Sequence, residues 1–215
     1  MNDKTIQSPP KKKVKDSVPF MNGSYDFSTV GSNGEIVYSE RELSITLGLP
    51  AETKEELQVI YSKVLRWMVD TGKSQLIFDV MKDYYFLAEV ESASTLSEVM
   101  ENGTLKLTLI ADPFKKSVDY VGSDIWDTFN FEEDYAQFNT YQINGSSTIK
   151  LYNPARVVRP LINCTSAMTM IKNGVTYNLS AGDNNVYGFN LDTGENVLTI
   201  NGNGTIKFLF RKESI

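Results

Sequence analysis

The sequence has no histidine and a single cysteine, Cys164, and these two shortages exclude several classes of function. Without histidine there is no Ser-His-Asp or Cys-His arrangement, no His-ligated zinc, and no side chain that ordinarily exchanges protons near neutral pH. One cysteine excludes a four-cysteine zinc site and an internal disulfide, which is typical of folding in a reducing cytoplasm. We therefore expect no enzyme, no catalytic residue, no cofactor and no metal.

Long apolar runs and an excess of positive charge are also missing. The polar segment 2–10 is followed by no apolar signal region, and no run approaches the length needed to span a bilayer. A net charge of −6 argues against a general nucleic-acid binder, which usually carries a basic excess. The apolar content of 41% over 215 residues is typical of a globular chain with one large or two small domains.

One long amphipathic helix is predicted over residues 53–70. Thr53 is a suitable N-cap, and Glu56 three residues later completes a capping box. Gly72 is expected to end the helix in the left-handed conformation. A single helix needs a sheet to bury its apolar face, so we expect strands to pack around it. That face is formed by apolar residues at helical spacing: Leu57, Ile60, Tyr61, Val64, Leu65 and Met68.

The remainder of the first half predicts strands. Residues 43–49 and 104–110 alternate between apolar and polar side chains, as half-buried strands do. Two further β-prone runs, 76–78 and 84–90, are separated by the polar pair Lys82-Asp83. Asn102-Gly103 is expected to form a hairpin turn, and Pro113 to interrupt the strand that follows it. We expect a first domain over residues 1–118.

Several short elements follow one another along this first half. They are Gly23-Ser-Tyr-Asp-Phe-Ser28, Tyr38-x-x-Arg41-x-Leu43, Leu65-x-Trp67, Tyr84-Tyr85 leading to Val90, and Gly103 to Phe114. This ordered set resembles the distal tail proteins of tailed phages. The resemblance implies a split-barrel-like domain that forms the belt of a ring. The positions that match the family are Gly23, Tyr25, Asp26, Tyr38, Arg41, Trp67 and Pro113.

Regularly spaced short strands are predicted over residues 139–215, which favours a β-sandwich domain. Asn-Gly pairs at 144, 173, 201 and 203 are expected to form the turns between them. The resemblance implies that this half is a galectin-like sandwich, so the fold class is mostly β with one α-helix. The expected strands are Thr148–Tyr152, Arg156–Ile162, Ala167–Ile171, Val175–Leu179, Val186–Asn190, Asn196–Ile200 and Thr205–Phe210.

Residues 119–138 are acidic and aromatic and are expected to connect the two domains. Their carboxylates suit a glycosidase pair or calcium ligands in principle. Their spacing matches no EF-hand loop, and no other catalytic group accompanies them, so a solvated surface is favoured. These carboxylates are Asp124, Asp127, Glu132, Glu133 and Asp134.

Lys11-Lys-Lys-Val-Lys15 is the one basic block of the chain. It has the composition of a nuclear localisation signal or a nucleic-acid patch, but such short matches are often false. A solvated loop, or one side of a charge-paired contact with an acidic subunit, is favoured instead.

The resemblance implies a structural role at the tip of a phage tail. It implies a homohexameric ring that contacts the major tail tube protein and a tail-associated fibre or lysin protein. DNA would cross the ring only in transit, no membrane would be involved, and the protein would be made in the bacterial host cytoplasm before joining the virion. The sequence does not identify the residues of the ring interface.

Two alternatives remain open. The first is a carbohydrate-binding module for receptor recognition, with Trp126 and Tyr187 as candidates for stacking on sugars. Tyr152 and Tyr177 are further candidates of the same kind, and for all four aromatics a core or domain-interface position is favoured. The second is a hydrolase that uses carboxylates alone, which no motif supports.

Overall fold

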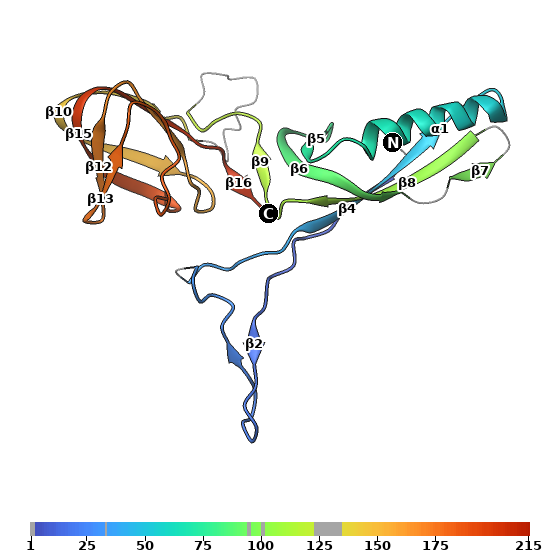
Figure 1. The fold of residues 1–215 in the computed structure, drawn as a ribbon, viewed down its shortest axis with the longest axis horizontal. Coiled ribbons are helices and arrows are strands. Elements are labelled where there is room, and N and C mark those ends of the chain that lie inside the picture. Colours follow the sequence, from blue (N-terminus) through green and yellow to red (C-terminus); the bar gives the residue numbers. More distant parts are fainter. Residues whose placement is uncertain (1–2, 33, 94–95, 100–101, 123–134) are drawn as a thin grey trace. The chain divides into compact units, whose positions relative to one another are not determined.

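The computed structural model describes residues 3–32, 34–93, 96–99, 102–122 and 135–215, which are mostly β-strand with one helix (Figure 1). The mostly β fold with a sandwich that the sequence predicts is thereby confirmed. The chain forms two compact units. The first contains residues 1–77, 86–115 and 215, and the second contains 78–85 and 116–214.

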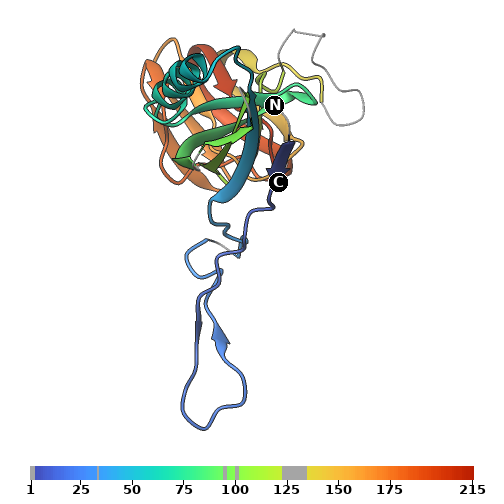
Figure 2. The same ribbon diagram turned by 90° about the vertical axis from the view of Figure 1, so that its right-hand side faces the viewer.

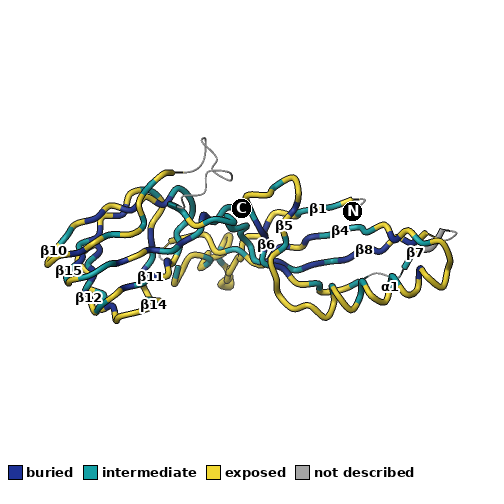
Figure 3. The backbone as a smooth tube through the Cα atoms, turned by 90° about the horizontal axis from the view of Figure 1, so that it is seen from above, coloured by how far each residue is buried: buried dark blue, intermediate teal, exposed yellow. Residues whose placement is uncertain are grey.

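Four strands of an eight-stranded sheet follow one another in the first unit, in the order β1 (Asp3–Ile6), β4 (Arg41–Leu49), β8 (Asn102–Ala111) and β6 (Met81–Ala93). The short β7 (Ser97–Val99) also pairs with β8, and β5 (Ser74–Phe78) follows the helix. The predicted alternation in β4 and β8 is confirmed, because one face of each strand is buried (Figure 3). Lys82 and Asp83 were expected to separate the β-prone runs 76–78 and 84–90, but both residues lie within β6.

Helix α1 (Lys54–Met68) begins where the sequence predicts. The N–H of Glu56 donates to the hydroxyl of Thr53 at 3.1 Å, which confirms the cap. The carboxylate of Glu56 accepts from the N–H of Glu52 at 2.8 Å, one residue earlier than the predicted capping box requires. The prediction for Gly72 was wrong, because Gly72 has no positive φ and the helix ends at Val69 in helical conformation.

Between β1 and β4 the chain forms a narrow two-stranded arm, here defined as residues 7–39 (Figure 2). Its only regular pairing in the described chain is between β2 (Lys15–Asp16) and β3 (Tyr25–Asp26). The arm has no core of its own, since its larger apolar side chains are exposed.

The second unit is built around a long antiparallel ribbon of β10 (Thr140–Asn153) and β15 (Gly194–Leu209), which pair without interruption. The opposite edge of β15 pairs with β12 (Met168–Lys172) and β11 (Leu161–Cys164), which bind β13 (Val175–Leu179) and β14 (Gly182–Asn184) at the edges. Strand β6 enters this unit and pairs Tyr84 and Tyr85 with β9 (Lys115–Ser117), and β16 (Glu213–Ser214) lies next to β9. The largest fully buried core residues are Phe189, Phe208, Ile143, Leu151, Ile162, Met170 and Leu191.

Only one of the predicted Asn-Gly turns in this unit is a turn. Asn173 and Gly174, both with positive φ, connect β12 and β13 as a two-residue hairpin loop. The pairs at 144, 201 and 203 lie inside β10 and β15, and the pair at 102 lies in β8, so these predictions were wrong. Residues 196–200 and 205–210 are therefore almost wholly parts of one strand, and 186–190 form a loop.

Candidate functional site

The base of the arm is fixed by backbone bonds and by the predicted residue Tyr38. The N–H of Lys12 donates to the carbonyl of Val37 at 2.8 Å, and Tyr38 forms an isolated bridge with Lys11. The Tyr38 ring packs edge-on against Phe114, with 5.5 Å between ring centroids. Aromatic pairs in this geometry add to the free energy of packing, so Tyr38 stabilises the point where the arm leaves the sheet.

Asp26 holds the two strands of the arm together. Its carboxylate accepts from the N–H of Ser28 at 2.9 Å and pairs with the ammonium of Lys13 at 3.3 Å. The hydrogen bonds from the hydroxyl and N–H of Ser28, with a smaller effect of Lys13, lower the pKa of Asp26 from 3.8 to about 2. The hydroxyl of Ser28 also accepts from the N–H of Val14 on the facing strand. Asp26 thus links the two strands of the arm.

A tight turn at the tip of the arm presents Phe20 to solvent. The N–H of Met21 donates to the carbonyl of Val18 at 3.1 Å, with Pro19 and Phe20 at the central positions. Phe20 has φ of 68°, and a turn with positive φ at its third residue ordinarily has glycine or asparagine there. A left-handed aromatic residue costs on the order of 1 kcal/mol, and such strain is concentrated at functional sites.

The arm exposes eight large apolar side chains that sequence reasoning missed. Among the predicted residues, Gly23, Tyr25 and Asp26 do lie here, and Tyr25 is exposed beside Phe27. The remaining apolar residues give no periodic signal, because the arm has almost no regular pairing. Apolar side chains exposed together on an element that has no core of its own are expected where a protein contacts a partner. Its members are Val14, Val18, Phe20, Tyr25, Phe27, Val30, Ile36 and Val37.

The other family-matching residues lie apart from the arm tip. Arg41 opens β4 and is only 3% exposed, with its guanidinium 5.3 Å from the ring centroid of Phe86. Its Nε has no hydrogen-bond partner within the described residues, and burial lowers the pKa of Arg41. Pro113 is half-buried in the interruption between β8 and β9, as predicted. Trp67 on α1 is 70% exposed.

Helix α1 retains uncovered apolar surface. Of the predicted apolar face only Leu57 is fully buried, and the residues from Ile60 to Met68 on that face are half-buried. Trp67 lies seven residues after Ile60 and therefore near the same side of the helix. The exposed carboxylates of Glu52, Glu55 and Glu56 lie at its N-terminal end. The sheet of the unit thus covers the helix face incompletely.

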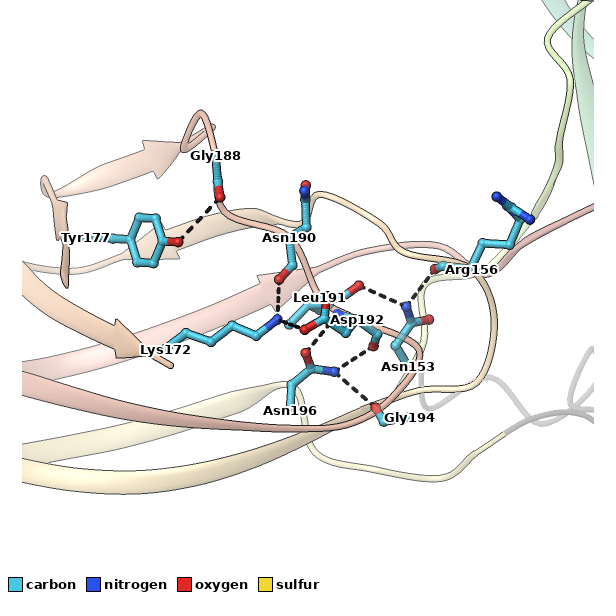
Figure 4. Close-up of polar contacts among 10 residues, drawn as sticks. All are labelled: Asn153, Arg156, Lys172, Tyr177, Gly188, Asn190, Leu191, Asp192, Gly194 and Asn196. Carbon is cyan, nitrogen blue, oxygen red and sulfur yellow. Dashed lines mark hydrogen bonds and ion pairs between the residues drawn. The ribbon is translucent and has the colours of Figure 1, made fainter. Parts of the chain in front are cut away.

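In the second unit, polar side chains fix the loop 186–194 (Figure 4). The ammonium of Lys172, which is almost fully buried, donates to the carbonyl of Asn190 at 2.6 Å and pairs with Asp192 at 2.8 Å. The amide of buried Asn153 donates to the carbonyl of Leu191 at 3.2 Å, and that of Asn196 donates to Asp192 and Gly194. The loop is therefore held from several strands.

This loop presents Tyr187, one of the two predicted sugar-stacking residues. Its side chain is 89% exposed, and the guanidinium of Arg159 lies 5.3 Å from its ring centroid. The flanking Phe189 is buried in the core and stacks edge-on against Tyr177. The other predicted residue, Trp126, lies outside the described residues, as do the carboxylates from Asp124 to Asp134.

The described part of the chain contains no cluster of three histidine, cysteine or acidic residues that could hold a metal ion. Within the same residues, no helix is long and apolar enough to cross a membrane. Cys164 is buried in the core of the second unit, and burial raises the pKa of its thiol.

Comparison with known proteins gives one kind of match. The chain matches no protein-family model and no curated protein sequence. Among solved structures it is similar to the SPP1 Dit protein (gp 19.1), described as a paradigm of the hub adsorption apparatus in phages that infect Gram-positive bacteria. The alignment covers 100% of this chain and 93% of that chain, with a TM-score of 0.66 and 12% identity. The resemblance to phage distal tail proteins is thereby confirmed at the level of the fold.

Proposed function

We propose that this chain is a structural, non-enzymatic protein of a phage tail tip, and that its arm joins copies of the chain into a homohexameric ring. The fold, shared over the full length with a phage hub protein, supports the tail role. The observation that carries the ring proposal is the arm, which exposes eight large apolar side chains and a strained Phe20 at its tip.

The net charges of the arm and of the whole chain have opposite signs, which favours a second copy of the chain as the partner of the arm. Residues 7–39 contain four of the 21 basic residues but three of the 27 acidic residues, so the arm is net positive on a chain of net charge −6. Three of the four lysines belong to the block Lys11–Lys13. Complementary charge steers association and fixes the orientation of partners, so an acidic copy of the same protein attracts the arm.

Helix α1 supplies the matching surface on the neighbouring copy. It combines a half-buried apolar face and exposed Trp67 with carboxylates at Glu52, Glu55 and Glu56. The arm combines apolar side chains with Lys11–Lys15. Because the two surfaces differ, their contact is heterologous, and heterologous contacts between identical chains form a ring when the rotation that relates neighbours closes.

The further partners follow from the same family resemblance. We propose that the ring contacts the major tail tube protein on one side and a fibre or lysin protein on the other, within the virion and without a membrane. The second unit would serve as a galectin-like outer domain. An acidic lumen would repel DNA phosphate, so that DNA passes without binding.

The native mass tests this proposal. The purified chain is analysed by light scattering after gel filtration at high concentration, with negative-stain images of the same peak. Six copies of 24.2 kDa give 6 × 24.2 = 145.2 kDa, and a particle of this mass with a central hole is expected. A chain that remains monomeric at high concentration contradicts ring formation by the arm.

Sugar binding by the second unit is a second candidate, because a fixed loop presents Tyr187 next to Arg159. An exposed aromatic ring with an adjacent hydrogen-bond donor suits a saccharide with a negatively charged group. A glycan array compares the native chain with Tyr187→Ala. Binding that is lost in the variant supports this function, and an array without binding contradicts it.

A further inference from the structure

We propose that Asn22 is a site of spontaneous covalent modification, at which its side-chain amide converts to aspartate or isoaspartate. The backbone nitrogen of Gly23 attacks Cγ of Asn22, and the new N–Cγ bond forms as the Cγ–Nδ2 bond breaks. Ammonia leaves, taking up the proton of the Gly23 amide, and a succinimide ring remains. One water molecule then opens the ring at either carbonyl. No enzyme, oxidant or cofactor is required.

This reaction has clear structural requirements. The backbone N–H after the asparagine must be free, because a nitrogen held in a hydrogen-bond ladder neither loses its proton nor turns toward Cγ. The asparagine side chain must be free to rotate. A following glycine is favourable, because it has no Cβ to obstruct the ring and little restriction on φ and ψ.

Asn22-Gly23 meets all of these requirements. Both residues lie in the bend between β2 and β3 and are exposed. Neither residue makes a hydrogen bond within the described chain. A Cβ atom on Gly23 would have no heavy atom within 4 Å, so no neighbouring group obstructs the space beside this residue.

The Asn-Gly pairs inside strands do not meet these requirements for succinimide formation. The N–H of Gly145 donates to Oδ1 of Asn203 at 3.0 Å, which engages the attacking nitrogen of one pair and the side chain of another. Gly202 is closely packed, since its Cβ position would lie 2.8 Å from Cγ of Met168. Gly103 lies in β8, paired on both sides. In all of these pairs the reaction requires the strand to open first.

Asn173-Gly174 provides an internal comparison. It is exposed like Asn22-Gly23, but it forms the two-residue loop between β12 and β13, and the pairing of Lys172 with Val175 holds the two ends of this loop together. Exposure alone therefore predicts equal rates at Asn22 and Asn173, whereas conformational freedom predicts that Asn22 reacts first. The pair that begins with Asn33 lies partly outside the described residues and is monitored as a separate peptide.

The modification would change the proposed docking surface; this consequence rests on the proposed function, whereas the chemistry does not. It adds a negative charge to a net positive arm, two residues from Phe20. Isoaspartate also inserts a methylene group into the backbone next to the turn that presents Phe20. Free chains would thus lose the ability to assemble as they age, whereas assembled arms, covered by a neighbour, would be protected.

Peptide mapping of the full chain tests the site. The protein is incubated at mildly alkaline pH, and each Asn-Gly peptide is followed by mass spectrometry with separation of aspartate and isoaspartate forms. Asn22 is expected to convert first, more than about tenfold faster than Asn144, Asn201 and Asn203, because those need local opening. Conversion of Asn22 no faster than these three or than Asn173 overturns the proposal.

One variant, compared with the native chain, separates the modification at Asn22 from its effect on assembly. Asn22→Gln lengthens the side chain by one methylene and is expected to abolish conversion at residue 22 while the other peptides are unchanged. If aged native chain loses self-association and aged Asn22→Gln does not, the effect on assembly is confirmed. If both lose it equally, the link to assembly is overturned. If fresh protein never assembles, the ring proposal fails while the mapping result stands.

Discussion

A Cβ atom on Gly103 would lie 2.8 Å from Cδ1 of Leu57, the fully buried residue of helix α1. The same position would lie 2.9 Å from Cδ1 of Leu96. The packing of these two leucine side chains therefore leaves no room for a side chain at residue 103 unless they shift. The glycine that sequence analysis assigned to a hairpin turn has a packing role instead.

Gly103→Ala is expected to destabilise the protein by about 1–3 kcal/mol, because a methyl group at this position overpacks the contact with Leu57. The free energy of unfolding in urea is the measurement. Gly72→Ala is the control, since Gly72 is exposed, has no positive φ and has no neighbour within 4 Å of the Cβ position. Equal stability of the two variants would contradict the packing role.

Phe20→Gly is expected to separate folding from assembly. Glycine adopts positive φ without strain, so the free energy of unfolding should stay equal or rise by a few tenths of a kcal/mol. The apolar tip is removed at the same time, so self-association by light scattering should weaken. Asparagine also tolerates this φ, so Phe20→Asn should behave like Phe20→Gly. Undiminished assembly of both variants would exclude the tip from the interface.

The arm is expected to loosen in acid. The pKa of Asp26 is lowered from 3.8 to about 2 by Ser28 and Lys13, so its carboxylate stabilises the folded arm above pH 3.8. This stabilisation is lost as the pH falls from 3.8 toward about 2 and Asp26 becomes protonated. Amide hydrogen exchange at Val14 and Phe27 should accelerate over this range. Asp26→Asn should show fast amide exchange already at neutral pH. Identical exchange in the native chain and the variant would refute the role of Asp26 in stabilising the arm.

Lys172→Met is expected to cost about 1–3 kcal/mol, because it leaves the carbonyl of Asn190 without its buried donor. Lys150→Met is the matched control: Lys150 pairs with Glu195 at 3.1 Å, but both side chains are exposed. An exposed ion pair contributes about 0–1 kcal/mol. Urea unfolding of both variants is the measurement. Amide exchange at Leu191, whose N–H donates to the carbonyl of Val158 at 2.8 Å, is the local readout. A larger loss for Lys150→Met would contradict the role of Lys172 in fixing the loop.

Local patterns in the sequence predicted the features that depend only on residues close together in the chain. These features are the cap at Thr53, the apolar face from Leu57 to Met68, and the alternation in β4 and β8. Each of them is set by residues only a few positions apart in the sequence. The arm itself was not predicted from the sequence, which only singled out some of its residues as positions that match the family. Tyr25, Asp26 and Tyr38 lie in or at the arm, but the strained turn at Phe20 was missed, because proline followed by phenylalanine is not a signal for positive φ.

The sequence by itself determined the fold class, the place of the helix and the exclusion of histidine and disulfide chemistry. The tertiary structure decided what each Asn-Gly pair does. The same dipeptide forms a turn at Asn173 and lies within a continuous strand at Asn201 and Asn203. The physical reason is that β15 pairs with β10 on one edge and with β11 and β12 on the other. Hydrogen bonds to distant strands outweigh the local turn preference, and no local pattern contains that information.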